Sequence, residues 1–394
     1  MDNAATSFPK PLTVLQAMNR YATEVGASAG RGAYGEAIES AHVIAECRER
    51  LRTLFNGERA EHFIFTHNCS HGLNIALKGL VLYQLKKGEK PHCICTCIDH
   101  NSILRPLNAM QDMGWISQSR IAIDPRTGLV DPEDIRKAIT PATRLIAVTH
   151  ASNVTGTLQD LRKITAIARE HAIPLVVDAA QSVGHVPIDV QADEIDIIAM
   201  PGHKGLLGPL GTGVLYIRPG MEKIMLPLME GGTGSVSEQP YQPEFMPDRF
   251  ESGSHNAVGI AGLSEGVQWL INKGPKAMLS HDRELMATFI EGISIVNIPG
   301  LKYFGPQGLA NRVGVFSLRM DGFTPNELAA ALESEYGILT RPGIHCAPLA
   351  HQAIGTLATG GTTRFSFGPF LSQADVNFAT DCLADVMICR KEGR

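Results

Sequence analysis

The chain has 394 residues, of which 44% are hydrophobic and 19% are charged, and its formal net charge is −5. This composition is typical of a globular protein, and the length predicts about two to three domains around a large core. A slightly acidic chain does not favour nucleic acid or an anionic membrane surface as a partner. The sequence also lacks an apolar run of the roughly 18 residues that a membrane span needs.

The first ten residues are polar and contain no apolar segment of the secretory type. Eight cysteines in 394 residues are too few for a disulfide scaffold. Together these features predict a reducing, cytoplasmic location.

From about residue 60 to residue 220, short apolar runs alternate with segments of helical periodicity. The predicted strands are Phe63–Thr66, His92–Ile98, Leu145–Thr149, Leu175–Asp178, Ile195–Ala199 and Gly213–Ile217. The predicted helices between them include Asn74–Leu82, Pro132–Ile139 and Asp160–His171. This alternation predicts right-handed βαβ units and an α/β fold with a mostly parallel sheet.

A stretch rich in glycine and proline, from Glu230 to Pro247, interrupts the alternation and predicts a long functional loop. A helix at Ile260–Asn272 follows, and the tail mixes helices with strands at Val313–Leu318 and Thr363–Phe367. We therefore expect a large domain over 13–260 and a smaller α+β domain formed by 1–12 and 261–394.

Polar side chains follow five of the predicted strands. They include Asn68-Cys69-Ser70, Asp99-His100, Ser152-Asn153, Asp178-Ala179-Ala180-Gln181 and His203-Lys204. Ligands of open α/β sheets bind beyond the carboxyl ends of the strands, so we expect these residues to converge on one site.

The chemistry that such a site can support is narrow. Lys204, in a glycine-rich loop, can form a Schiff base with an aldehyde cofactor. Asp178 can keep a pyridine nitrogen protonated, which makes such a cofactor an electron sink. Cys69 and Ser70, placed before a predicted helix, suit a phosphate group.

The run His92-Cys93-Ile94-Cys95-Thr96-Cys97 places three thiols on one face of a strand, with a spacing unlike that of zinc sites. It predicts buried packing. His67 and His71 also have a metal-like spacing but belong to the loop assigned to the cofactor, so no metal site is expected.

These motifs resemble those of cysteine desulfurases and selenocysteine lyases, the class V aminotransferase-like branch of fold-type I enzymes that depend on pyridoxal 5'-phosphate (PLP). The resemblance extends from Asp2-Asn3-Ala4-Ala5-Thr6 to Arg364-Phe365-Ser366. Its most specific motifs are His150-Ala151-Ser152-Asn153-Val154-Thr155-Gly156, Val177-Asp178-Ala179-Ala180-Gln181-Ser182, Gly202-His203-Lys204-Gly205 and Arg341-Pro342-Gly343-Ile344-His345-Cys346-Ala347. It implies the fold of that class, with a large PLP-binding domain and a smaller α+β domain.

For the cofactor, the resemblance implies that Lys204 forms the Schiff base and afterwards moves the substrate Cα proton. Asp178 would contact the pyridinium nitrogen and Gln181 the phenolic oxygen, while His100 would stack on the ring. The residues implied around the phosphate are Cys69, Ser70, His203 and, from a neighbouring subunit, Ser254, which also implies a homodimer.

For the substrate, the resemblance implies that Asn153 and Arg364 hold the carboxylate, with Arg341 close by, and that Cys346 is the nucleophile that takes the sulfur. The short segment around Cys346 resembles the group with a compact catalytic loop. With His345 beside it and Arg341 within reach, we expect the thiolate of Cys346 to be stabilised.

Three departures from the family pattern concern the phosphate. Asn68-Cys69-Ser70 stands where Gly-Thr-Thr is usual, Pro201 replaces a hydroxyl residue and lacks an N–H, and Ser254 replaces a threonine. Phosphate anchoring is therefore expected to be rearranged, with backbone amides at the helix start still available.

The resemblance implies a cysteine desulfurase that converts L-cysteine to L-alanine, keeps the sulfur as a persulfide on Cys346 and passes it to an acceptor protein or a cofactor-maturation partner. Selenocysteine lyase activity on L-selenocysteine is an alternative that the sequence does not separate. Two others are a transaminase or β-eliminating lyase in which Cys346 is idle, and a catalytically silent scaffold.

Overall fold

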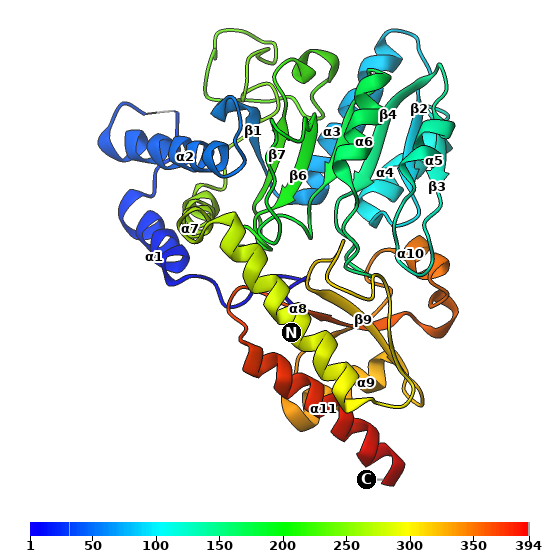
Figure 1. The fold of residues 1–394 in the computed structure, drawn as a ribbon. Helices are drawn as coiled ribbons and strands as arrows, with labels where there is room; N and C mark the ends of the chain where they lie inside the picture. The colour runs from blue at the N-terminus through cyan, green and yellow to red at the C-terminus, as the bar shows by residue number, and fades with distance from the viewer. Residues whose placement is uncertain (31, 393–394) are drawn as a thin grey trace.

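The computed structural model describes residues 1–30 and 32–392. At its centre is a seven-stranded sheet with the order β1-β7-β6-β5-β4-β2-β3 (Figure 1). The strands are β1 (Phe63–Thr66), β2 (His92–Thr96), β3 (Ser117–Ile121), β4 (Thr143–Thr149), β5 (Leu175–Asp178), β6 (Ile197–Pro201) and β7 (Gly213–Ile217). Only β7 pairs antiparallel, with β1 and with β6, so the predicted mostly parallel α/β fold is confirmed.

Helices cover both faces of this sheet. One buried apolar cluster lies between the sheet and α3 with α4, and a second lies between the opposite face and α2, α5, α6 and α7. The bounds of these helices and of α1 are α1 (Leu12–Arg20), α2 (Gly35–Leu54), α3 (Cys69–Lys86), α4 (Asn101–Asp112), α5 (Pro132–Ala138), α6 (Leu161–Glu170) and α7 (Ala257–Lys273). Burial on both faces explains why the central strands are continuous apolar runs in the sequence.

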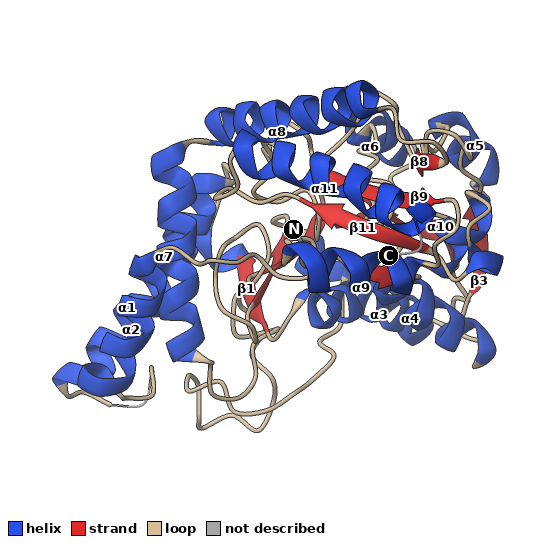
Figure 2. Ribbon diagram, turned by 90° about the horizontal axis from the view of Figure 1, so that it is seen from below, coloured by secondary structure: helices blue, strands red, loops and turns tan. Residues whose placement is uncertain are grey.

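A second, antiparallel sheet with the order β10-β11-β9-β8 follows in the C-terminal part. Its strands are β8 (Leu301–Tyr303), β9 (Val315–Met320), β10 (Arg341–Gly343) and β11 (Thr362–Ser366). Figure 2 shows α8 (Pro275–Val296), α9 (Pro325–Tyr336) and α11 (Gln373–Glu392) over this sheet, and their apolar side chains form a third buried cluster. The short helix α10 (Pro348–Ala353) follows β10.

The domain boundary at residue 260 stays a prediction. Helix α7 contributes Leu263 and Val267 to the cluster under the large sheet, whereas α8 contributes Phe289 to the cluster of the small sheet. We propose that the division lies at Gly274, which separates these two helices and has a φ of +81°.

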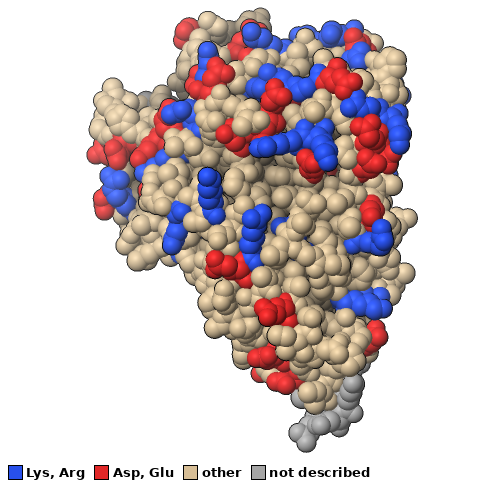
Figure 3. All heavy atoms as spheres, viewed as in Figure 1, with Lys and Arg blue, Asp and Glu red and all other residues tan. Residues whose placement is uncertain are grey.

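The segment between Met225 and Asn256 contains neither helix nor strand, so the long loop predicted from Glu230 to Pro247 is confirmed. The face in Figure 3 carries acidic and basic side chains interspersed with one another. Among the residues that the structure describes, no helix is long and apolar enough to cross a membrane.

Candidate active site

The carboxyl ends of β1, β2, β4, β5 and β6 surround a cavity of about 110 Å³. The predicted site residues among those that line it are Cys69, Ser70, His100, Asn153, Asp178, Gln181, His203 and Lys204. The expected convergence of the strand ends is therefore observed.

Lys204 lies in a tight loop after β6. A side chain at Gly202 would collide with Thr212, and one at Gly205 would collide with the carbonyl of Val183, so the loop needs glycine at both positions. Burial and then Arg364 lower the pKa of Lys204, against an opposing effect of Asp178. A lowered pKa favours the neutral amine, the form that attacks an aldehyde.

Asp178 ends β5 and is 2% exposed. Its Oδ1 accepts hydrogen bonds from the backbone N–H of Ala180 at 2.9 Å and from the thiol of Cys69 at 3.5 Å. Burial, followed by the charge of Asp178, raises the pKa of Cys69 well above its ordinary value. Cys69 therefore remains a thiol that donates to the carboxylate.

His100 is the N-cap of α4 and borders the same cavity. The backbone N–H of Ser102 donates to its Nδ1 at 3.1 Å, and the Ser102 hydroxyl lies 2.9 Å from Nδ1 and 2.6 Å from the hydroxyl of Ser70. Burial lowers the pKa of His100, against an opposing effect of Asp178. The sequence analysis did not single out Ser102, which lies in the first turn of α4, two residues after His100.

The first ten residues pack against the lysine loop. The carbonyl of His203 accepts hydrogen bonds from Ser7 N at 3.1 Å and from Lys10 Nζ at 2.7 Å. The side-chain amide of Gln181 donates to the carbonyl of Ala4 at 2.9 Å. Burial, then Lys204 and Lys10, lower the pKa of His203 to about 4, so this imidazole is neutral at pH 7.

Arg341 and Arg364 are opposite each other on β10 and β11. Arg364 is 1% exposed, and its two terminal nitrogens donate to the carbonyl of Asn153 at 3.2 Å and to the carboxylate of Asp2 at 2.8 Å. Its Nε has no hydrogen-bond partner. This guanidinium therefore keeps one donor without a partner.

Cys346 is exposed in the turn between β10 and α10. His345 and Cys346 both have positive φ, +52° and +59°, a strained backbone that neighbouring contacts must hold. The Asn153 amide donates to the carbonyl of His345, and Asn101 N donates to the carbonyl of Cys346 at 2.8 Å. These bonds fix the turn against two of the strand ends that surround the cavity.

The expectation that His345 helps to stabilise the thiolate of Cys346 is wrong. His345 is 3% exposed, and burial followed by Arg364 lowers its pKa to about 2, so the imidazole carries no charge at neutral pH. A cation that does lie close to Cys346 is Arg341, whose guanidinium is 4.0 Å from Sγ.

Ser254 does not line the Lys204 cavity. It borders a separate cavity of about 530 Å³ beside α2 and the start of α7. In the same segment, Glu251 is held by a buried pair of hydrogen bonds from Arg48 and by one from His255 at 2.7 Å.

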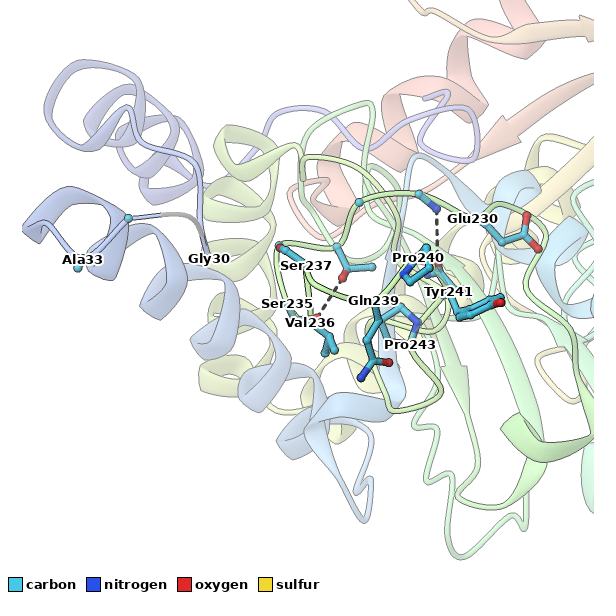
Figure 4. Close-up of a pocket in the computed structure, with 16 residues that line it drawn as sticks. Gly30, Ala33, Glu230, Ser235, Val236, Ser237, Gln239, Pro240, Tyr241 and Pro243 are labelled. Atoms are coloured by element: carbon cyan, nitrogen blue, oxygen red, sulfur yellow. Dashed lines mark hydrogen bonds between the residues drawn. The ribbon is translucent and has the colours of Figure 1, made fainter.

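A further cavity of about 810 Å³ lies between the loop from Glu230 to Pro243 and Gly30 with Ala33 (Figure 4). None of the predicted site residues lines it, and Glu230 is the one charged side chain among its described lining residues.

Cys93 and Cys95 are buried in the apolar cluster against α3 and α4, as predicted. The prediction is wrong for Cys97, which follows the end of β2 and is half-buried. The rings of His67 and His71 stack with centroids 5.1 Å apart. Within 1–30 and 32–392, no group of three or more ligating side chains is arranged to hold a metal ion.

Three residues that line the Lys204 cavity have a buried polar atom without a hydrogen-bond partner, namely Thr149 Oγ1, Asn153 Oδ1 and His203 Nδ1. Such atoms indicate a polar ligand, because buried polar groups are normally paired. A lysine amine, a buried carboxylate and the start of a helix in one cavity suit a ligand with an aldehyde, a ring nitrogen and a phosphate. On an α/β fold, this combination defines a PLP-dependent enzyme.

Comparison with known proteins agrees with this class. The model of the aminotransferase class-V family matches residues 1–378, so the chain belongs to this family, whose cofactor is PLP. A protein of Methanothermobacter thermautotrophicus described as "Probable cysteine desulfurase" is 34% identical over 387 residues, which cover 98% of this chain and 94% of the relative.

Solved structures show the same relationship. The apo structure of a cysteine desulfurase from Thermococcus onnurineus has a TM-score of 0.90 at 30% identity, covering 98% of this chain and 94% of that one. The cysteine desulfurase CsdA of Escherichia coli has a TM-score of 0.85 at 26% identity, with the same coverage.

Proposed function

We propose that this protein is a cysteine desulfurase that converts L-cysteine to L-alanine and keeps the sulfur as a persulfide on Cys346. The observation that carries the proposal is the exposed Cys346 in a turn that Asn153 and Asn101 tie to the cofactor cavity, with Arg341 4.0 Å from its sulfur. An exposed thiol beside a permanent cation is a competent nucleophile.

In the proposed reaction, the thiolate of Cys346 attacks the substrate sulfur, so an S–S bond forms while the C–S bond breaks. The electron pair of the broken bond goes to the carbon skeleton, which takes up protons and leaves as alanine. Cysteine and the thiol thus become alanine and a persulfide, and no external oxidant is consumed. Bound PLP supplies the electron sink at Cα.

Each role that the family implies within one subunit would fall to a residue in or near the cavity. Lys204 would bind the cofactor aldehyde and move the Cα proton, and its lowered pKa supports both tasks. Asp178 would hold the ring nitrogen, with Gln181 at the phenolic oxygen and His100 on the ring. The phosphate would contact Cys69 and Ser70 at the start of α3, together with His203.

Arg364 would bind the substrate carboxylate, with Asn153 and Arg341 beside it. Ser254 would reach the phosphate of a second subunit, which makes a homodimer part of the proposal. A sulfur acceptor and a cytoplasmic, reducing location also belong to it, since a persulfide must pass its sulfur on before it is oxidised.

The test is mass spectrometry of the holoenzyme after incubation with L-cysteine, together with measurement of alanine. We expect about 32 Da of added sulfur on Cys346 and a near-total loss of alanine formation in Cys346→Ala. Cys97→Ala, which changes a half-buried thiol after β2, is the matched control.

Unchanged turnover of cysteine by Cys346→Ala would replace the proposal with a lyase or aminotransferase activity. If turnover on L-selenocysteine were high and turnover on L-cysteine negligible, the protein would be a selenocysteine lyase.

A further inference from the structure

Three side chains form a continuous hydrogen-bond chain along the edge of the cofactor cavity. The Ser70 hydroxyl in the first turn of α3 lies 2.6 Å from the Ser102 hydroxyl in the first turn of α4. The Ser102 hydroxyl lies 2.9 Å from Nδ1 of His100. The chain therefore connects the start of α3 with the imidazole that borders Lys204.

The number of hydroxyl hydrogens in this hydrogen-bond chain limits which groups can donate and which can accept. Each serine hydroxyl has one hydrogen, so the two contacts can be satisfied if Ser70 donates to Ser102 and Ser102 donates to Nδ1. The backbone N–H of Ser102 also donates to Nδ1, at 3.1 Å. With both donors directed at Nδ1, a neutral His100 carries its proton on Nε2.

A phosphate group at Ser70 changes this count. The phosphate accepts hydrogen bonds and offers none, so Ser70 must use its one hydrogen for the phosphate. Ser102 must then donate to Ser70, and the contact between Ser102 and Nδ1 needs a hydrogen from the ring. This arrangement keeps the 2.6 Å contact between the two hydroxyls hydrogen-bonded and gives up the longer, 3.1 Å bond from the backbone N–H of Ser102 to Nδ1. The bond from Ser70 to the phosphate forms with either ring tautomer.

We propose that Ser102 is a positioning residue that links phosphate binding at Ser70 to the position of the ring proton on His100. With the phosphate bound, the proton moves to Nδ1, and the unprotonated Nε2 becomes available as a base on the cofactor side. Without the phosphate, the proton stays on Nε2. The inference rests on the proposed contacts of Ser70 and His100 with the cofactor.

The charged groups that face His100 come from several elements. They are Asp178 after β5, Lys204 after β6, Arg341 on β10 and Arg105 on α4. These groups are the same whether the cofactor carries a phosphate or not, so a comparison of PLP with pyridoxal isolates the effect of the phosphate.

The experiment uses protein labelled with ¹⁵N at histidine and loaded with either PLP or pyridoxal, each fixed to Lys204 by borohydride reduction. Mass spectrometry verifies loading, and His100→Gln identifies the ring signals of His100 in the NMR spectrum. We expect a protonated Nδ1 in the PLP form and a protonated Nε2 in the pyridoxal form.

Two variants separate the link from general effects on the fold. In Ser102→Ala, both forms should protonate Nε2, and the pKa of His100 in the PLP form should fall. Ser102→Thr, which keeps the hydroxyl, should restore the difference. Identical tautomers in the two wild-type forms, or a difference that persists in Ser102→Ala, would overturn the proposal.

This readout is independent of desulfuration. Absence of a persulfide on Cys346 would refute the proposed function while leaving the ring-proton result intact, and the converse also holds.

Discussion

The guanidinium of Arg364 donates a 2.8 Å hydrogen bond to the carboxylate of Asp2, although 362 residues separate them in the chain. The side chain of Arg364 is 1% exposed and that of Asp2 is 28% exposed. Because a buried cation needs a counter-charge, Asp2 stabilises Arg364 in place. The unpartnered Nε is the donor that the proposed function assigns to the substrate carboxylate.

We expect Arg364→Ala to raise the KM for L-cysteine by about 10- to 100-fold, since a hydrogen bond to a charged group contributes about 1.5–3 kcal/mol. Steady-state measurement of alanine formation gives this value. Arg319→Ala on the neighbouring strand β9 is the control and should leave KM unchanged. A lower kcat with an unaltered KM would exclude Arg364 from carboxylate binding.

The buried pair of Arg48 and Glu251 has a less buried counterpart, in which Arg50 of the same helix pairs with Glu265 and also with Glu46. Glu251→Gln should lower the free energy of unfolding by about 3–5 kcal/mol, because it leaves Arg48 buried without a counter-charge. Glu265→Gln should cost no more than about 1 kcal/mol. Urea unfolding of the two holoenzyme variants measures both changes in the free energy of unfolding. Equal losses in the two variants would contradict the larger contribution expected of the buried pair.

The contribution of the Arg48–Glu251 pair to the free energy of unfolding depends on pH. Burial alone would raise the pKa of Glu251, but Arg48 and His255 outweigh it and lower the pKa to about 2. A lowered pKa in the folded state gives stability that is present above the ordinary value of about 4.3 and is lost as pH falls towards 2. The difference in stability between wild type and Glu251→Gln should therefore shrink on acidification.

His185, in the loop after β5, forms a 2.6 Å contact with Asp282 on α8. Burial opposes the charge on His185, but Asp282 outweighs it, so the pKa of His185 is raised. This contribution to stability is complete below about pH 6.5 and is lost as pH rises through the raised value. His185→Gln should thus lower the unfolding temperature more at pH 6 than at pH 9, unlike the exposed control His171→Gln.

Cys346 should react first when the native holoenzyme is treated with iodoacetamide. It is exposed, whereas the other described cysteines are buried or, for Cys97, half-buried. Cys69 borders the cofactor cavity but should stay unmodified, because its raised pKa keeps it protonated and only the thiolate reacts. Peptide mapping by mass spectrometry measures the order, and early modification of Cys69 would contradict it.

Strands with strong apolar runs were predictable from sequence. Phe63–Thr66, Leu175–Asp178 and Gly213–Ile217 were predicted with the bounds that the structure has. The strand from His92 ends at Thr96, two residues early, because the carboxylate of Asp99 accepts the N–H of Thr96 at 2.6 Å and turns the chain.

Three strands, β3, β8 and β10, were not predicted because their sequences lack a clear apolar pattern. Strand β3 is at the edge of the sheet and has a mostly polar sequence, while β8 and β10 contain three residues each. These segments are strands because neighbouring strands pair with them in the folded protein, and the local sequence pattern does not indicate that pairing.

The residues of the site that follow strands were also predictable, because the α/β topology brings those strand ends together. Contacts between segments that are distant in the sequence could not be predicted. Neither the pair of Asp2 with Arg364 nor the bond from Asn153 to His345 has a local sequence signal. The burial that keeps His345 uncharged likewise depends on the folded structure around it.

The contacts of the first residues join the two sheets. The backbone N–H of Ala4 donates to the hydroxyl of Ser366 on β11, and the carbonyl of Ala4 accepts from the side-chain amide of Gln181 after β5. The same segment donates from Ser7 and Lys10 to the carbonyl of His203, next to Lys204. A displacement of the small sheet relative to the large one would therefore pull on the loop that carries the lysine.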